Sequence, residues 1–147
     1  MTNQELFLEK VTAYARRNEL WKSGEKILVA VSGGPDSLAL LLALYQIAPK
    51  AEITLGCCCV NHHLRDTAVE EAEFVQGVCR DLNIDFFFKD IDVLKRVEHG
   101  GSVETVAREL RYKALREIRD LGGYDKIAIA HHGNDQVETI LYHMIKG

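Results

Sequence analysis

Four short, mostly apolar runs of strand length constrain the fold of this chain most strongly. The first is continuously apolar and lacks the alternation of a half-exposed strand, so both faces of that strand should be buried, and the second also fits a buried strand. Segments with helical periodicity separate the runs. The pattern therefore predicts an α/β fold, an open and mostly parallel sheet with helices on both faces. The runs are Ile27–Val31, Ile53–Val60, Ile84–Phe88 and Ile127–Ala130.

The intervening segments carry signals for the start and end of helices. Thr2 and Glu5 have the spacing of a capping box, and Ser102 can cap a later helix. Gly122–Gly123 should end that helix. Besides a first helix near the N-terminus, the predicted helices are Ser37–Ile47 with a stop at Pro49, Thr67–Leu82, Val103–Leu121 and an amphipathic Asp135–Ile145.

Length and charge limit the class of protein. The 147 residues are enough for one domain with a core, and the formal net charge is -4. The domain as a whole is therefore not a basic clamp for nucleic acid, and any grip on RNA must come from a local patch. No apolar run is long enough to span a membrane, and the polar, acidic start is unlike a targeting signal, so we expect a cytoplasmic protein.

The cysteines indicate a core rather than a metal centre. Cys57, Cys58 and Cys59 are consecutive inside a predicted strand, so their side chains should alternate between two buried faces. No C-x-x-C pair is present. We expect His63 and His131 to be surface or packing residues, because adjacent histidines of the pairs 62–63 and 131–132 point apart and do not form a zinc site.

The turn Ser32–Ser37 is the segment most informative about chemistry. It follows a predicted buried strand and opens a helix, the place where open α/β sheets bind ligands. Gly33 and Gly34 let backbone N–H groups approach an anion, and the helix directs its positive end to the same place. The spacing is neither that of a Walker A loop nor that of a dinucleotide fingerprint. Asp36 would repel phosphate unless a cation intervenes, which points to Mg²⁺.

Beyond this chemistry, the turn resembles the S-G-G-x-D-S loop of the N-type ATP pyrophosphatases, which cleave ATP between its α and β phosphates. Three other segments resemble the tRNA(Ile)-lysidine synthase family more specifically. They are similar in order and spacing to its motifs V-[ND]-H-x-L-R, A-R-x-x-R-Y and A-H-H-x-[DN]-D-Q-x-E-T. The matching segments are Val60–Arg65, Ser102–Tyr112 and Ala130–Thr139.

The resemblance implies an activity and its partners. Enzymes of this family join free lysine to C2 of the first anticodon cytidine of an isoleucine tRNA, after ATP has adenylylated that cytidine. It implies ATP and Mg²⁺ as cofactors. It also implies that residues 1–147 are an N-type ATP pyrophosphatase domain, truncated from a longer protein whose tRNA-binding regions lie elsewhere. A homodimer is one option that the sequence leaves open.

The resemblance also implies roles for individual residues. Asp36 would hold Mg²⁺, with Asp135 as a second candidate ligand. Arg111 would neutralise charge on the α-phosphate and is preferred to Arg108 for this role. A solvated helix face is the alternative for these arginines, since Glu104 and Arg108 form an i,i+4 pair. Further residues expected to bind ATP are Ser32, Gly33, Gly34, Pro35, Ser37, His62 and His132.

Asp135 and Glu138 are three residues apart at the start of the predicted last helix. They would share one helix face, where the pair could bind Mg²⁺ or deprotonate the incoming lysine amine. Acidic residues are also favoured in a first helical turn for purely electrostatic reasons. Gly133 and Asn134 depart from the family pattern, and the amide at 134 makes that position a weaker metal ligand.

Two other functions stay open from the sequence. One is a tRNA thiolation enzyme with the same loop, although the C-x-x-C cysteines usual in such enzymes are absent. The other is a module that binds ATP or AMP without catalysis. Asp36, Arg111, Asp135 and Glu138 favour catalysis, because a sensor needs no such charged set.

Overall fold

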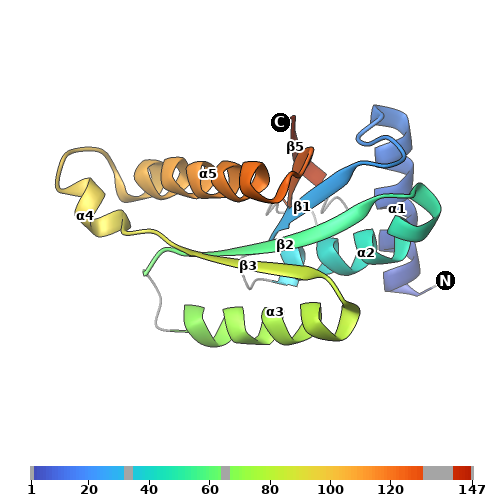
Figure 1. Ribbon diagram of the computed structural model, residues 1–147, viewed down its shortest axis with the longest axis horizontal. Helices are drawn as coiled ribbons and strands as arrows, with labels where there is room; N and C mark the ends of the chain where they lie inside the picture. The colour runs from blue at the N-terminus through green and yellow to red at the C-terminus, as the bar shows by residue number, and fades with distance from the viewer. Residues whose placement is uncertain (1, 32–34, 64–66, 131–140, 147) are drawn as a thin grey trace.

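The computed structural model describes residues 2–31, 35–63, 67–130 and 141–146. Within these residues, helices alternate with strands, and the strands form one five-stranded sheet in the order β3-β2-β1-β4-β5 (Figure 1). The strands are β1 (Lys26–Ala30), β2 (Thr54–Asn61), β3 (Asp85–Asp90), β4 (Lys126–Ala130) and β5 (Leu141–Lys146). The helices are α1 (Asn3–Asn18), α2 (Pro35–Ala51), α3 (Ala68–Leu82), α4 (Val93–Val97) and α5 (Val103–Gly122).

The path of the chain through the sheet changes direction at β1. From β1 the chain moves outward to β2 and β3, and then returns to place β4 on the other side of β1. These four strands are parallel. Helices α1, α2 and α3 lie on one face, and α5 covers the other (Figure 1). The predicted parallel sheet with helices on both faces is thus confirmed.

Both faces of the central strands are buried, as the continuous apolar runs predict. In β1, Ile27 and Val29 pack among residues of α1 and α2, whereas Leu28 and Ala30 pack beneath Leu115 of α5. Because alternate side chains enter two separate cores, a polar residue at either phase of the strand would be buried. This requirement accounts for the absence of alternation in the sequence.

The two sides of the β1–β4 pair are also joined at the amino edge of the sheet. The Lys126 ammonium donates to Oε1 of Glu25 and to the Leu20 carbonyl, both at 2.8 Å. The Lys26 N–H donates to the Asp125 carboxylate at 2.8 Å. Burial alone would raise the pKa of Glu25, but the hydrogen bonds from Lys126 and from the Lys22 N–H outweigh it and lower that pKa. These bonds hold the segment before β1 against the start of β4.

The helix caps predicted from the sequence form. Thr2 Oγ1 accepts from the Glu5 N–H at 3.1 Å, and Ser102 Oγ accepts from the Thr105 N–H at 3.2 Å. Gly123 follows α5 with a φ of +70°, the left-handed conformation that ends helices. The capping residues and the glycine therefore predicted the start of α1 and both ends of α5 correctly.

The three consecutive cysteines belong to the core, as predicted. Cys57 and Cys59 lie on the face covered by α3, together with Cys79, and Cys58 lies on the opposite face. Burial raises the pKa of Cys58 to about 12. Hydrogen bonding with the Cys59 and Cys79 thiols, followed by burial, also raises the pKa of Cys57. Both thiols are therefore protonated and unreactive at neutral pH.

The helix predicted over Asp135–Ile145 is wrong for its second half. Leu141–Lys146 forms β5, which pairs antiparallel with β4, while residues 135–140 lie outside the described residues. Leu141, Met144 and Ile145 have a spacing that fits a helix as well as a short strand, so periodicity alone did not separate the two. The edge of β4 that faces away from β1 needs hydrogen-bond partners, and β5 supplies them.

The expected stop at Pro49 is also wrong, because α2 continues to Ala51 and contains Pro49. A proline so close to the end removes one helical hydrogen bond, that to the Tyr45 carbonyl, and leaves the preceding turns intact. A further helix, α4, has no counterpart in the prediction. None of the described helices is long and apolar enough to cross a membrane.

Two glycines should respond in opposite ways to the same substitution. A Cβ at Gly56 in β2 would overlap the hydroxyl of the buried Tyr124, whereas at Gly77 in α3 its nearest neighbour is the Arg80 guanidinium at 3.8 Å. We expect Gly56→Ala to destabilise the protein by about 1–3 kcal/mol. Gly77→Ala should stabilise it by about 0.5–1 kcal/mol, because alanine favours the helix.

Urea unfolding of the two variants and the parent checks this pair. A Gly56→Ala variant as stable as the parent would contradict the packing of Tyr124 over β2.

Candidate nucleotide site at the carboxyl edge of the sheet

The carboxyl ends of β1 and β4 lie side by side at the point where the strand order reverses. The chain after β1 passes to α2, and the chain that leads into β4 comes from α5 on the opposite face. In open parallel sheets, ligands bind at the carboxyl ends of the strands where the strand order reverses. Two of the sequence motifs, Ser32–Ser37 and Ala130–Thr139, begin at these two strand ends.

Several predicted site residues cannot be placed. Ser32, Gly33, Gly34, His132, Asp135 and Glu138 lie outside the described residues, as do the side chains of Pro35 and Asp36. Among the described residues, no group of three His, Cys, Asp or Glu side chains could hold a metal ion. The assignment of Mg²⁺ to Asp36, and of a second ligand to Asp135, therefore stays a prediction.

Ser37 is the described member of the predicted phosphate loop. It lies in the first turn of α2 and is only 6% exposed, although serine is usually a surface residue. Its position puts it at the positive end of a 17-residue helix. The start of α2 therefore has the electrostatic character that the phosphate-binding prediction requires.

Strand β2 extends beyond the end of β1 and forms one wall of the edge. Pairing with β1 ends at Ala30, opposite Cys58, and the Val31 N–H makes one further bond to the Cys58 carbonyl at 3.0 Å. Strand β2 continues to Asn61, paired with β3. The end of β2 therefore projects past the end of β1, and the half-buried His62 directly follows this projecting rim.

Asn61 fixes the chain at this rim. Its side chain is 4% exposed, and its Oδ1 accepts from the His63 N–H at 3.0 Å. The Asn61 carbonyl accepts from the Ile91 N–H at 2.9 Å. His63 has a φ of +59°, and its ring lies 3.0 Å from an Asp90 carboxylate oxygen. These bonds set the direction in which the chain carries His62 past the end of β2.

Arg111 comes to the same edge from the other face. It precedes Leu115 and Ile118 on the stripe of α5 that packs on the sheet. Burial lowers the pKa of the Arg111 guanidinium, and the neighbouring Tyr112 and Cys58 act against that shift. Cys58 is opposite Ala30 at the end of β1, so the Arg111 side chain lies close to the start of the predicted phosphate loop.

Arg111 also has no counter-ion among the residues that the structure describes. None of the ion pairs within the described part of the chain includes it. A guanidinium that has lost part of its water is costly unless an anion replaces that water. Arg108, one turn earlier, is exposed and lies over the Tyr112 ring at 5.6 Å. The structure thus separates the two arginines as the sequence analysis did, with Arg111 inward and Arg108 outward.

The edge therefore gathers Ser37, His62 and Arg111 from three different elements. The sequence analysis gave no role to Asn61, although it lies within the quoted Val60–Arg65 segment, and none to Asp90. The position of Asn61 at the end of an apolar strand could have indicated its role, since a buried amide needs hydrogen-bond partners. The partnership of Asp90 with His63 depends on the pairing of β2 with β3 and could not be read from the sequence.

Comparison with known proteins identifies the domain. A family model described as "PP-loop domain" matches residues 4–147. A tRNA(Ile)-lysidine synthase of Clostridium perfringens (strain 13 / Type A) is 40% identical over 141 residues. A tRNA(Ile)-lysidine synthase of Thermosipho africanus is 38% identical over 148 residues. A "Bifunctional protein TilS/HprT" of Listeria innocua is 39% identical over 142 residues.

These matches cover most of this chain but a minor part of each relative. They span 95%, 100% and 95% of the chain, and 30%, 34% and 22% of the Clostridium, Thermosipho and Listeria proteins. The chain therefore corresponds to about a third or less of the length of the curated relatives.

Solved structures share the fold at low sequence identity. The U34-tRNA thiolase NcsA from Methanococcus maripaludis superposes with a TM-score of 0.69 at 18% identity, covering 86% of this chain and 45% of that one. The NH3-dependent NAD synthetase from Campylobacter jejuni has a TM-score of 0.62 at 14% identity, covering 90% and 58%. Together with the family match over residues 4–147, these findings show that the chain belongs to the PP-loop domain family.

Proposed function

We propose that this domain catalyses the ATP-dependent joining of lysine to C2 of the first anticodon cytidine of an isoleucine tRNA, with release of AMP and pyrophosphate. The similarity to tRNA(Ile)-lysidine synthases over 95% of the chain supports the choice of reaction. The observation that carries the site is the inward Arg111, a partly desolvated cation near the end of β1 that forms no ion pair with any described residue. Such a residue suits an anion that arrives with the substrate.

The reaction has two steps, each with one bond formed and one broken. The cytidine O2 attacks the α-phosphate of ATP, and pyrophosphate leaves with the electrons of the α–β bond. The ε-amine of lysine then attacks C2, loses a proton, and expels AMP. Negative charge builds on the α-phosphate oxygens in the first step, and the second step needs a base.

The residues at the edge of the sheet match these needs. The Ser32–Ser37 turn and the positive end of α2 would hold the departing pyrophosphate. Arg111 would stabilise the charge that develops on the α-phosphate, since a guanidinium already held in place loses little freedom in the transition state. His62, carried past the end of β2 by the Asn61 bonds, would lie against the nucleoside. His132 would join the ATP site from the loop after β4.

The acidic residues would complete the chemistry. Asp36 would bind Mg²⁺, whose contribution is to neutralise the phosphate oxygens of ATP. Asp135 and Glu138 would orient and deprotonate the lysine amine, with Asp135 as a second candidate for the metal. A tRNA and free lysine are thus the proposed partners, and the proposed site of action is the cytoplasm, where both are found with ATP.

The proposal is tested with the complete protein and labelled lysine. With ATP, Mg²⁺ and an unmodified isoleucine tRNA, lysine should enter the tRNA with one AMP released for each lysine bound. A tRNA whose first anticodon cytidine is replaced by uridine should accept none. Release of AMP and pyrophosphate with no lysine in the tRNA would contradict the proposed reaction and favour another member of the PP-loop family or a nucleotide sensor.

A second prediction separates Arg111 from Arg108. Arg111→Ala should lower kcat about 10²–10³-fold and change the KM for ATP only a few-fold, because the partner charge develops in the transition state. Arg108→Ala removes the same charge from the outward face of the same helix and should leave kcat within about two-fold. Steady-state kinetics of lysine incorporation at saturating tRNA measures both.

Equal losses in the two variants would mean that α5 contributes only general positive charge. A large rise in the KM for ATP at unchanged kcat would instead assign Arg111 to ground-state binding.

A further inference from the structure

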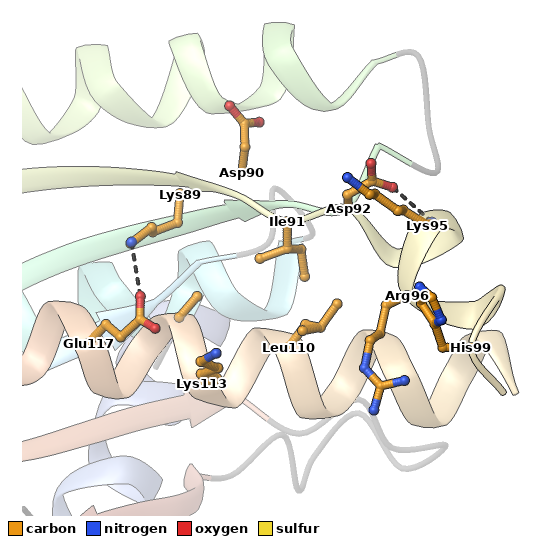
Figure 2. Close-up of a pocket in the computed structure, with 11 residues that line it drawn as sticks. Lys89, Asp90, Ile91, Asp92, Lys95, Arg96, His99, Leu110, Lys113 and Glu117 are labelled. Atoms are coloured by element: carbon orange, nitrogen blue, oxygen red, sulfur yellow. Dashed lines mark hydrogen bonds and ion pairs between the residues drawn. The ribbon is translucent and has the colours of Figure 1, made fainter. Parts of the chain in front are cut away.

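A depression lined mostly by charged side chains lies beside the edge of the sheet, between β3, α4 and α5. We call it the β3–α5 groove. Figure 2 shows residues from all three elements facing it, with Ile91 and Leu110 toward its floor. Its volume is about 350 Å³. The lining residues are Lys89, Asp90, Ile91, Asp92, Lys95, Arg96, His99, Leu110, Lys113, Ala114 and Glu117.

The acidic side chains of the groove are already engaged. Glu117 Oε2 lies 3.0 Å from the Lys89 ammonium, which lowers the pKa of Glu117, with a smaller effect from Lys113. Asp92 Oδ1 accepts from the Lys95 N–H at 3.0 Å and caps α4. Asp90 pairs with His63 and points away from α5 (Figure 2). Glu117 is thus paired chiefly with Lys89, and neither Asp90 nor Asp92 forms an ion pair with Lys95, Arg96 or Lys113 in the described part of the chain.

Two of those cations have no counter-ion. Arg96 extends from α4 and Lys113 projects from α5, both exposed (Figure 2). Neither forms an ion pair with a carboxylate in the described ranges. The chain has a formal net charge of -4. The two cations beside Lys89 therefore make this part of the surface more positive than the domain as a whole. This is the kind of local patch that RNA binding by an acidic domain requires.

The groove is also well placed relative to the candidate site. Strand β3 is two strands away from β1, which corresponds to about 10 Å at the usual spacing of strands. Both the groove and the site are reached from the carboxyl edge, since Lys89 and Asp90 end β3 and α4 follows directly. A single strand whose reacting nucleotide lies at the end of β1 can extend to this groove.

The chemistry of the lining favours a phosphate backbone over a base. Single-strand sites that stack bases usually present Phe, Tyr or Trp rings, and among the residues lining this groove the imidazole of His99 is the one aromatic ring. Lysine and arginine with a shallow apolar floor suit phosphates and the ribose between them. The groove is therefore adapted to position an RNA strand without reading its sequence.

We propose that the β3–α5 groove holds backbone phosphates of the RNA strand next to the reacting nucleotide, through Arg96 and Lys113. This inference rests on the proposed function, because it assumes that the substrate is an RNA. It assigns a binding role to α4, which matches none of the motifs in the sequence.

The test measures tRNA binding by the complete protein as a function of salt. In Arg96→Gln/Lys113→Gln, affinity for the unmodified isoleucine tRNA should fall about tenfold or more, because two charge-assisted contacts are lost. Between about 50 and 200 mM salt, the slope of log K against log salt should become shallower by about 1.4, at about 0.7 for each phosphate contact on a single strand. Fluorescence anisotropy with labelled tRNA gives both quantities.

Two control variants accompany the measurement. Arg17→Gln/Arg80→Gln removes the same charge from exposed residues near the ends of α1 and α3, at the amino edge of the sheet, and should keep the parent slope. Arg96→Lys/Lys113→Arg keeps the charge in the groove and should keep most of the affinity. A thermal unfolding midpoint within the range of the controls shows that the glutamine variant is folded.

The outcomes separate this inference from the proposed function. If the parent incorporates lysine while the glutamine variant keeps the parent affinity and slope, the groove is not an RNA site. If the variant raises the KM for ATP and leaves tRNA binding unchanged, the groove binds nucleotide phosphate and the inference is wrong. If the parent neither binds the tRNA nor incorporates lysine, the proposed function fails and this inference fails with it.

Discussion

The parallel pairing of β1 with β2 on one side and with β4 on the other determines where chemistry can occur in this molecule. It brings two strand ends together at one edge of a sheet that is covered by α2 on one face and by α5 on the other. The pairing is stabilised from both faces by separate cores and at the amino edge by the bonds of Lys126 and Lys26. The open carboxyl edge is thus supported by the part of the structure that is most completely buried.

From this arrangement the residues of the edge acquire different electrostatic roles. Ser37 is held at the positive end of α2, and Arg111 reaches the edge from the opposite face without a counter-ion in the described ranges. The projecting end of β2, with Asn61 bonded to His63 and Ile91, gives the edge a wall on one side. A polyphosphate bound there would meet positive potential from both faces of the sheet, which is what cleavage between phosphates requires.

The sequence predicted the sheet and the helix ends well because those features depend on local rules. Continuous apolar runs marked strands buried on both faces, and Thr2, Ser102 and Gly123 marked helix ends through bonds within one turn. Leu141–Lys146 was predicted as a helix because no local signal in the sequence marks its pairing with β4. The same limit applies to Asp90, whose role depends on the pairing of β2 with β3.

For the site, the sequence separated Arg111 from Arg108, and the structure places the first inward and the second outward. The sequence did not predict a role for the groove cations, because no motif contains Arg96 and because α4 is only five residues long. Their grouping appears only when the end of β3, α4 and α5 are brought together. A charged patch built from separate segments can be recognised only once the fold brings those segments together. A phosphate loop is one contiguous segment and can be recognised in the sequence directly.

The central claim is that the turn after β1 holds the pyrophosphate end of ATP. A crystal structure of the complete protein with Mg²⁺ and a non-hydrolysable ATP analogue tests it most directly. The account predicts the β- and γ-phosphates on backbone N–H groups of residues 32–34, 36 and 37, the metal on Asp36, and the Arg111 guanidinium near the α-phosphate. Nucleotide bound elsewhere, with that turn empty and Arg111 far from any phosphate, would contradict it.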